Sequence, residues 1–242
     1  MKLTVLGKYG PFPKENGGTS SYLLRCEGKN ILLDAGESSF SRLIHILPPE
    51  KLDAIVLTHS HFDHICDTGV FIYYFEALSK RGENFKKPLL FCYDDGSPII
   101  KTLLNSPFFE VKEISLNKTF DLGGVNLGFS LVKHPAVTHA VTIKSEGKIF
   151  VYTGDTNLFD GLYNLVSPSD AFLADGGLLE KDWKAEKPHL SVGKISELSK
   201  KCANKSIISH LNPLYTEEEI CAEAEKFGGN FVVAKEGETY EI

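Results

Sequence analysis

Residues 58–64 read Thr58-His59-Ser60-His61-Phe62-Asp63-His64, so three histidines and one aspartate fall within six positions. This run follows an apolar stretch that ends at Leu57 and precedes a segment with the apolar spacing of a helix. Alternate side chains of an extended segment face the same way, so His59, His61 and Asp63 converge while His64 turns in at the helix start. Imidazole and carboxylate together suit a borderline divalent ion such as zinc. A purely solubilising role is disfavoured, because unpaired polar groups at the end of a buried strand are costly.

Short apolar runs bounded by Gly, Asn and Pro predict strands along the whole chain, at residues 3–6, 22–24, 31–34, 54–57, 125–133, 140–144, 149–153, 171–173 and 207–208. Apolar residues spaced by three and four positions predict helices at residues 40–47, 65–80, 192–201 and 216–226. A last pair of strands, at residues 231–233 and 239–242, is expected to close on the Gly-containing segment 235–238.

An early set of strands without intervening helices is mirrored by a similar later set. This pattern predicts an α+β fold in which two mixed β-sheets face each other and helices cover the outside, an αββα sandwich. We find no linker composition, so one domain over residues 1–242 is expected. Residues 85–118 are the hardest to interpret; packing of a peripheral helix is favoured over a role in lining a substrate pocket.

Composition and charge exclude several classes of protein. Hydrophobic residues make up 42% and charged residues 24% of the 242 residues, which is typical of an ordered globular chain. The net charge of −6 argues against a surface that neutralises many phosphates, so no long nucleic acid is expected as a partner. The first apolar stretch reaches Gly7 and Pro11 too soon for a signal peptide or membrane span, so a cytoplasmic protein without membrane contact is expected. The five cysteines form no CxxC pair and are expected to be reduced.

The run at residues 59–64 matches H-x-H-x-D-H at every fixed position, and in this it resembles the metallo-β-lactamase superfamily. The resemblance extends over most of the chain, because further segments follow in the family's order at or just after predicted strand ends. These segments are Gly18-Thr-Ser-Ser-Tyr22, Leu33-Asp-Ala-Gly36, His134, Tyr152-Thr-Gly-Asp-Thr156 and His210.

The resemblance implies a site for two divalent metal ions. His59, His61 and His134 would hold the first ion, Asp63, His64 and His210 the second, and Asp155 would bridge both. A bridging carboxylate can hold two cations roughly 3.5–4 Å apart, and water between them is deprotonated near neutral pH. Zinc is the first candidate, with manganese or iron as alternatives. Outside the family pattern, His134 would be read as a structural histidine and Asp155 as an ordinary turn residue.

Two further residues are candidates for roles beside the metals. Asp34 ends an apolar strand and either orients a metal-bound imidazole through its free N–H or simply begins the turn before Gly36. His189 resembles a histidine that phosphodiesterase branches, ribonuclease Z among them, carry between the bridging aspartate and the last ligand. It could bind the scissile phosphate or protonate the leaving oxygen, or it could be an incidental residue before a helix. Asp63 and His189 are therefore the predicted catalytic residues.

The spacing of the motifs bears on the substrate. Ribonuclease Z enzymes insert a long tRNA-gripping arm between the third histidine motif and the bridging aspartate, whereas only 21 positions separate His134 from Asp155 here. That interval is filled by a hairpin pattern at Ser145-Glu-Gly-Lys148. The resemblance thus favours an arm-less phosphodiesterase that acts on a small or cyclic phosphodiester.

Two other functions remain open. A thioester or lactone hydrolase would use the same ligand types without needing a histidine at 189. A non-catalytic metal-binding sensor is disfavoured because no ligand is missing. His45 and His139 match no motif position and are expected to be structural or solvent-facing. The partner is expected to be a small-molecule substrate, and the sequence leaves a homodimer open.

Overall fold

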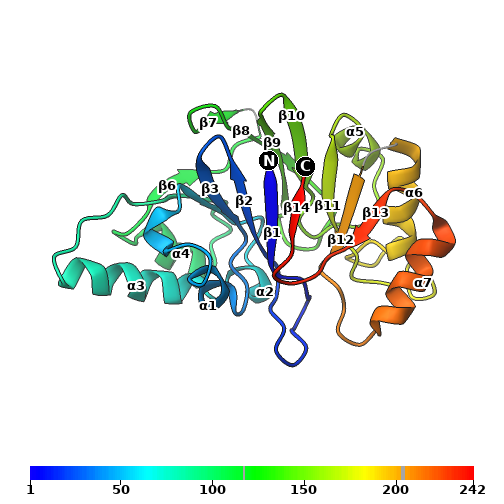
Figure 1. Ribbon diagram of the computed structural model, residues 1–242, viewed down its shortest axis with the longest axis horizontal. Helices are drawn as coiled ribbons and strands as arrows, with labels where there is room; N and C mark the ends of the chain where they lie inside the picture. The colour runs from blue at the N-terminus through cyan, green and yellow to red at the C-terminus, as the bar shows by residue number, and fades with distance from the viewer. Residues whose placement is uncertain (117, 203–204) are drawn as a thin grey trace.

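The computed structural model describes residues 1–116, 118–202 and 205–242. Two seven-stranded sheets face each other, and helices cover their outer faces (Figure 1). The strand order is β14-β1-β2-β3-β4-β5-β6 in the first sheet and β13-β12-β11-β10-β9-β8-β7 in the second. The predicted αββα sandwich is confirmed.

The first sheet is antiparallel from β14 to β3 and parallel from β3 to β6. Parallel neighbours need crossover connections, and helices supply most of them on the outer side of the sheet (Figure 1). The strands are β1 (Lys2–Gly7), β2 (Ser21–Cys26), β3 (Lys29–Leu33), β4 (Ala54–Val56), β5 (Leu89–Cys92), β6 (Glu110–Glu113) and β14 (Thr239–Glu241). The helical segments are α1 (Ser39–Leu43), the short 3₁₀ turn η1 (Pro49–Lys51), α2 (Phe62–Ile65), α3 (Thr68–Lys80) and α4 (Pro98–Leu104).

The second sheet is antiparallel from β7 to β10 and parallel from β10 to β13. Its β9–β10 hairpin places Ser145 opposite Lys148, as the sequence predicts. The strands are β7 (Phe120–Asp121), β8 (Asn126–Leu131), β9 (His139–Ser145), β10 (Lys148–Tyr152), β11 (Ala171–Asp175), β12 (Lys205–Ser209) and β13 (Phe231–Val233). The helices are α5 (Leu162–Val166), α6 (Val192–Cys202) and α7 (Glu217–Phe227). Within the described part of the chain, no helix combines the length and apolar character needed to cross a bilayer.

The core has three layers because strand side chains alternate between the two faces of a sheet. In β3, Ile31 and Leu33 enter the core between the sheets, whereas Leu32 packs outward under the helices of the first sheet. Phe172 of β11 likewise packs outward beneath α5 and α6. Strands buried on both faces read as continuous apolar runs, which is why the sequence pattern locates them.

Four details differ from the sequence predictions. The last two strands do not pair with each other: β13 lies parallel to β12, and β14 joins the first sheet beside β1. β13 extends the open edge of the second sheet and β14 extends the open edge of the first, so the segment between these two strands crosses from one sheet to the other. The predicted helix 65–80 is split into α2 and α3, because the N–H of Asp67 donates to the carbonyl of Ala35 and its carboxylate accepts from the N–H of Phe40.

The other differences are smaller. The predicted helix 40–47 has its α-helical part in α1, which ends at Leu43. Of the segment 85–118, the described residues 85–116 do pack against the core, but as β5, α4 and β6 rather than as a peripheral helix, and residue 117 lies outside the described residues. Phe91 of β5 lies in the core between the sheets.

Candidate metal centre

All seven predicted metal ligands lie at one edge of the sandwich, on the segments that follow the ends of strands. His59 to His64 follow β4, His134 follows β8, Asp155 follows β10 and His210 follows β12. The carboxyl ends of parallel strands meet at one edge of a sheet, so residues far apart in sequence come together there. The structure groups these ligands into two clusters in which the donor atoms lie within 4.8 Å of one another.

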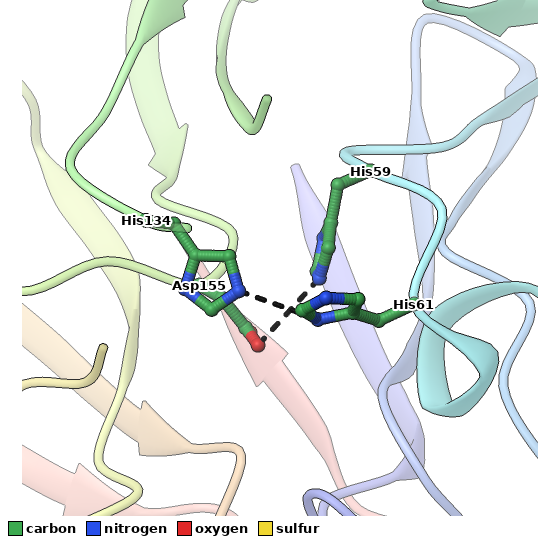
Figure 2. A group of neighbouring side chains, drawn as sticks. All are labelled: His59, His61, His134 and Asp155. Atoms are coloured by element: carbon green, nitrogen blue, oxygen red, sulfur yellow. Dashed lines mark hydrogen bonds and ion pairs between the residues drawn. The ribbon is translucent and has the colours of Figure 1, made fainter. Parts of the chain in front are cut away.

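The first cluster consists of His59, His61, His134 and Asp155 (Figure 2). His59 Nε2 lies 3.7 Å from Asp155 Oδ2, and His134 Nε2 lies 3.3 Å from His61 Nδ1. Figure 2 shows His59 and His61 reaching in from one loop toward His134 and Asp155 on the facing side. His61 is exposed and His134 half-buried, so this cluster is open to solvent on one side.

The second cluster consists of Asp63, His64, Asp155 and His210. His64 Nε2 lies 3.1 Å from Asp155 Oδ1 and 3.6 Å from Asp63 Oδ2. His210 Nε2 lies 3.9 Å from the same Asp63 oxygen. Asp155 belongs to both clusters and turns Oδ2 toward the first and Oδ1 toward the second, which is the placement that a bridging carboxylate requires.

The buried donor atoms are arranged for binding a metal rather than for hydrogen bonding to one another. Buried polar atoms are normally hydrogen-bonded, yet several ligand atoms have no partner in hydrogen-bonding geometry among the described residues. They are His59 Nε2, Asp63 Oδ2, His64 Nε2, Asp155 Oδ1 and His210 Nε2. Cations between them would satisfy these lone pairs and balance the charges of Asp155, which is buried, and Asp63, which is half-buried.

The protonation of the imidazoles suits the same role, because a metal ligand must be the neutral ring. Burial lowers the pKa of His210 to about 4 and holds the pKa of His59 well below its usual value. The pKa of Asp155 is also depressed: burial opposes its charge, but the surrounding His210 and His64 outweigh that effect. His59 and His210 therefore offer neutral imidazoles beside an ionised Asp155 at neutral pH. His64 differs: burial disfavours its charged ring, but Asp155 and Asp34 outweigh burial and raise its pKa well above the usual value, so a metal would have to displace a proton there.

Asp34 is fully buried and contacts the ring of His64 on the side away from the second cluster. Its Oδ2 accepts hydrogen bonds from His64 Nδ1 at 2.7 Å and from the Tyr152 hydroxyl at 2.6 Å. Thr58 donates through its N–H to Asp34 Oδ1 at 2.8 Å and through its hydroxyl to Oδ2 at 2.9 Å. Asp34 thus orients an imidazole of the second cluster, and of the two interpretations of this residue the structure supports the orienting one.

Close backbone approach also shapes the second cluster. A Cβ added to Gly10 would lie 2.0 Å from His210 Cε1, so only glycine leaves room for this ring. The hydroxyl of Ser20 lies 2.9 Å from His210 Nδ1 and fixes the ring from the other direction. Gly36 plays a similar part, because its added Cβ would lie 2.2 Å from the Asp63 carbonyl.

His189 lies beside both clusters and just before α6. Its Nδ1 is 2.7 Å from Asp175 Oδ2 and 3.9 Å from Asp155 Oδ2, and its ring stacks on His210 with centroids 5.1 Å apart. Burial disfavours the charged ring, but Asp175 more than compensates and raises the pKa of His189 to about 9. Asp175, His189 and His210 also form a third group with donor atoms in reach of one another.

Asp175 is a functional candidate that the sequence reading missed. Its Oδ1 accepts from Gly177 N at 2.9 Å and its Oδ2 from Thr156 N at 3.0 Å, so the carboxylate is rigidly held. The available signal was its position at the end of an apolar strand before Gly176, which repeats the setting of Asp34 before Ala35 and Gly36.

The remaining histidines lie outside the clusters, as expected. His45 is exposed on the segment after α1, and His139 is buried against the Tyr93 ring with centroids 5.3 Å apart. All five cysteines are free thiols.

Comparisons with known proteins agree with this geometry. The family described as beta-lactamase superfamily domain matches residues 29–210. The probable metallo-hydrolase YhfI of Bacillus subtilis (strain 168) is 26% identical over 100% of both chains. Its crystal structure covers 99% of this chain and 98% of that one at 24% identity, with a TM-score of 0.92. A ribonuclease Z of Mycobacterium bovis (strain BCG / Pasteur 1173P2) is 26% identical over 72% of this chain and 69% of its own length.

A diphosphatase of the PhnP family has the same fold, with a TM-score of 0.77 at 18% identity over 100% of this chain and 97% of that one. The family match spans most of the chain, including every motif histidine from His59 to His210. The chain therefore belongs to the metallo-β-lactamase superfamily and is a metal-dependent hydrolase of that fold.

Proposed function

We propose that this protein is a phosphodiesterase that hydrolyses a small or cyclic phosphodiester at a two-metal centre. The observation that carries the proposal is the His189–Asp175 pair beside the shared carboxylate of Asp155. Metal ligation alone does not require such a pair, whereas phosphoryl chemistry uses a cationic imidazole next to the scissile group.

In this proposal His59, His61 and His134 hold one ion, Asp63, His64 and His210 hold the other, and Asp155 bridges. Zinc suits the mixed imidazole and carboxylate donors, and manganese or iron are alternatives. When bound, such ions supply a hydrolytic nucleophile near neutral pH and positive charge for the anionic substrate.

His189 supplies the protein's own part of the reaction. Its Nδ1 donates to Asp175, and in this proposal Nε2 carries the proton that is offered to the substrate. Attack of a hydroxide oxygen on phosphorus forms one new P–O bond and breaks the ester P–O bond. The departing alkoxide takes the Nε2 proton. Asp175 stabilises the charged ring before that transfer and keeps it in one orientation.

Several observations support a short substrate. The chain between β9 and β10 is a tight hairpin rather than an inserted arm, and the net charge is −6. The relatives include a ribonuclease Z, and the fold is shared with a diphosphatase. A thioester or lactone hydrolase remains the alternative. A thiolate leaves without protonation, so a thioesterase would have little use for the His189–Asp175 pair.

The test is His189→Ala in the metal-loaded protein, with exposed His45→Ala as the matched control. The variant should keep its metals but lose roughly 10²–10⁴ in rate on alkyl phosphodiesters. The loss should be smaller on bis(p-nitrophenyl) phosphate, whose leaving group needs no proton. Equal losses on both would make His189 a phosphate binder rather than an acid. No loss on either, together with strong thioesterase or lactonase activity, would overturn the phosphodiesterase proposal.

A further inference from the structure

Among the large, purely apolar residues that the structure describes, the two most exposed lie on segments that carry metal-ligand candidates. Phe62 is 72% exposed and Leu214 is 76% exposed, whereas the next such side chain, Leu131, is 51% exposed. Scattered exposed apolar residues are normal on protein surfaces, but their gathering at one place marks a binding surface.

Chain geometry brings these two residues to the second cluster. Phe62 directly follows His61 and precedes Asp63, so its Cα lies about 3.8 Å from each neighbouring Cα. Leu214 lies four positions after His210, in a turn closed by the hydrogen bond from Tyr215 N to the Asn212 carbonyl. Because Asp63 and His210 approach to 3.9 Å, the two segments meet at this cluster.

A third apolar residue belongs to the same side. Gly10 packs directly on the His210 ring, and Phe12, two positions later, is 46% exposed. We call Phe12, Phe62 and Leu214 the apolar lip. Each comes from a different segment of the chain, and each of those segments contains or touches a ligand candidate of the second cluster.

The side toward His134 and His189 has a different character. Exposed Lys133 precedes His134, and its Nζ donates to the carbonyl of Ala185 in the loop that leads to His189. Lys184 and Lys187 of that loop are also exposed. Lysines also reach the side of the second cluster, because Lys14, two positions after Phe12, donates to the carbonyl of Tyr215 beside Leu214. The segments around the centre therefore carry lysines on both sides and the apolar lip on one.

We propose that the apolar lip binds a planar apolar group of the substrate, of the nucleobase class. The inference rests on the proposed function: if the scissile phosphodiester lies at the clusters, the rest of the bound substrate must extend over the residues around them. A flat ring stacked on Phe62 and covered by Leu214 would bury both side chains, and stacking of a base on an aromatic residue is insensitive to base identity. The lip selects for a base, and the lysines around the centre attract the anionic part.

The experiment compares two cyclic phosphodiesters on metal-loaded protein: adenosine 3′,5′-cyclic phosphate, which has a base, and glycerol 1,2-cyclic phosphate, which has none. Phe62→Ala should raise KM for the first by roughly 5- to 100-fold and leave kcat/KM for the second unchanged. Leu214→Ala should act in the same direction. Tyr73→Ala on α3 is the matched control, because this ring is 73% exposed and lies on no ligand-bearing segment.

The possible results separate the two proposals. Equal losses on both substrates would mean that Phe62 only shapes the metal site, and no loss on either would exclude the lip as a base-binding surface. Sedimentation gives a further test. If the wild type is a dimer and Phe62→Ala is a monomer, the proposal is overturned, because the lip would then be covered by a second copy of the chain. If the wild type hydrolyses neither substrate, the phosphodiesterase proposal fails; calorimetric binding of both compounds then still tests the lip, and equal affinity would reject it.

Discussion

Asp34 Oδ2 accepts a hydrogen bond from His64 Nδ1 at 2.7 Å, and the other ring nitrogen of His64 lies 3.1 Å from Asp155 Oδ1. The bond fixes the imidazole so that Nε2, and not Nδ1, faces the second cluster. Asp34 itself is fixed by Thr58 and Tyr152, which come from different sheets. One buried carboxylate thus links the orientation of a ligand candidate to the packing of both sheets.

Asp34→Ala should weaken metal binding without removing a ligand. Partners that orient metal-bound imidazoles typically contribute 10- to 100-fold in metal affinity, so a loss of roughly that size is expected. Competition with a chelator of known affinity measures it. Asp67→Ala, which removes a half-buried carboxylate outside the clusters, controls for general destabilisation. Unchanged affinity in Asp34→Ala would show that the packing of His64 alone positions the ring.

Asp155→Ala should have a larger effect, because this residue alone belongs to both clusters. Without the shared anionic ligand the two cations would repel each other with less compensation, so at least one ion should be lost. Activity should fall by roughly 10²-fold or more while the fold is kept. Elemental analysis and circular dichroism check the two parts of this prediction. Wild-type turnover in the variant would show that Asp155 is not the bridge.

Gly10→Ala tests whether backbone contact positions His210. The added methyl group would lie 2.0 Å from the ring, so the ring or the loop must move. We expect selective loss of the ion at the second cluster, seen as a metal content that falls toward one ion per chain. Gly128→Ala is the matched control, since an added Cβ there meets no atom within 4 Å. Full metal content in both variants would mean that the loop yields instead.

The fold and the ligand run at residues 59–64 follow from local patterns in the sequence, whereas His134, Asp155 and His210 were implied by the resemblance to the superfamily. The continuous apolar runs of β3 and β11 locate buried strands, and polar residues at strand ends locate the edge where ligands gather. The pairing partners of the last strands do not follow, because β13 and β14 are only three residues long and their places depend on the open edges of the two sheets. Asp175 was missed for a related reason: its role comes from His189, which lies 14 positions away in the sequence and meets it only in the folded chain.

Glu223 of α7 is expected to hold the loop that carries His189. Its carboxylate accepts from Glu180 N at 2.8 Å and from Gly193 N at 2.9 Å, and these two residues stand at the two ends of that loop. Glu223→Ala should therefore reproduce the leaving-group dependence of His189→Ala in weaker form while both metals are retained. Exposed Glu218→Ala on the same helix is the control. A uniform loss on all substrates would indicate a structural role only.

Asp175→Asn should change how His189 responds to pH. Burial disfavours protonation of the ring, and the Asp175 carboxylate outweighs burial to place the pKa of His189 at about 9, above the ordinary 6.5. Removing the charge should lower this pKa, which NMR titration of the metal-free protein measures directly. Because the folded-state pKa is raised, protonation stabilises the fold: this contribution is full below pH 6.5 and is lost as the pH rises toward 9.

Unfolding of the metal-free proteins tests the same linkage independently. The wild type should be more stable than Asp175→Asn at pH 6, and the difference in the free energy of unfolding should shrink as the pH rises to 9. The alkaline fall in phosphodiesterase activity should also move to lower pH in the variant, because less of the ring keeps its proton. A stability difference that is the same at both pH values would mean that Asp175 acts through its hydrogen bonds to Thr156 and Gly177, and not through the charge of His189.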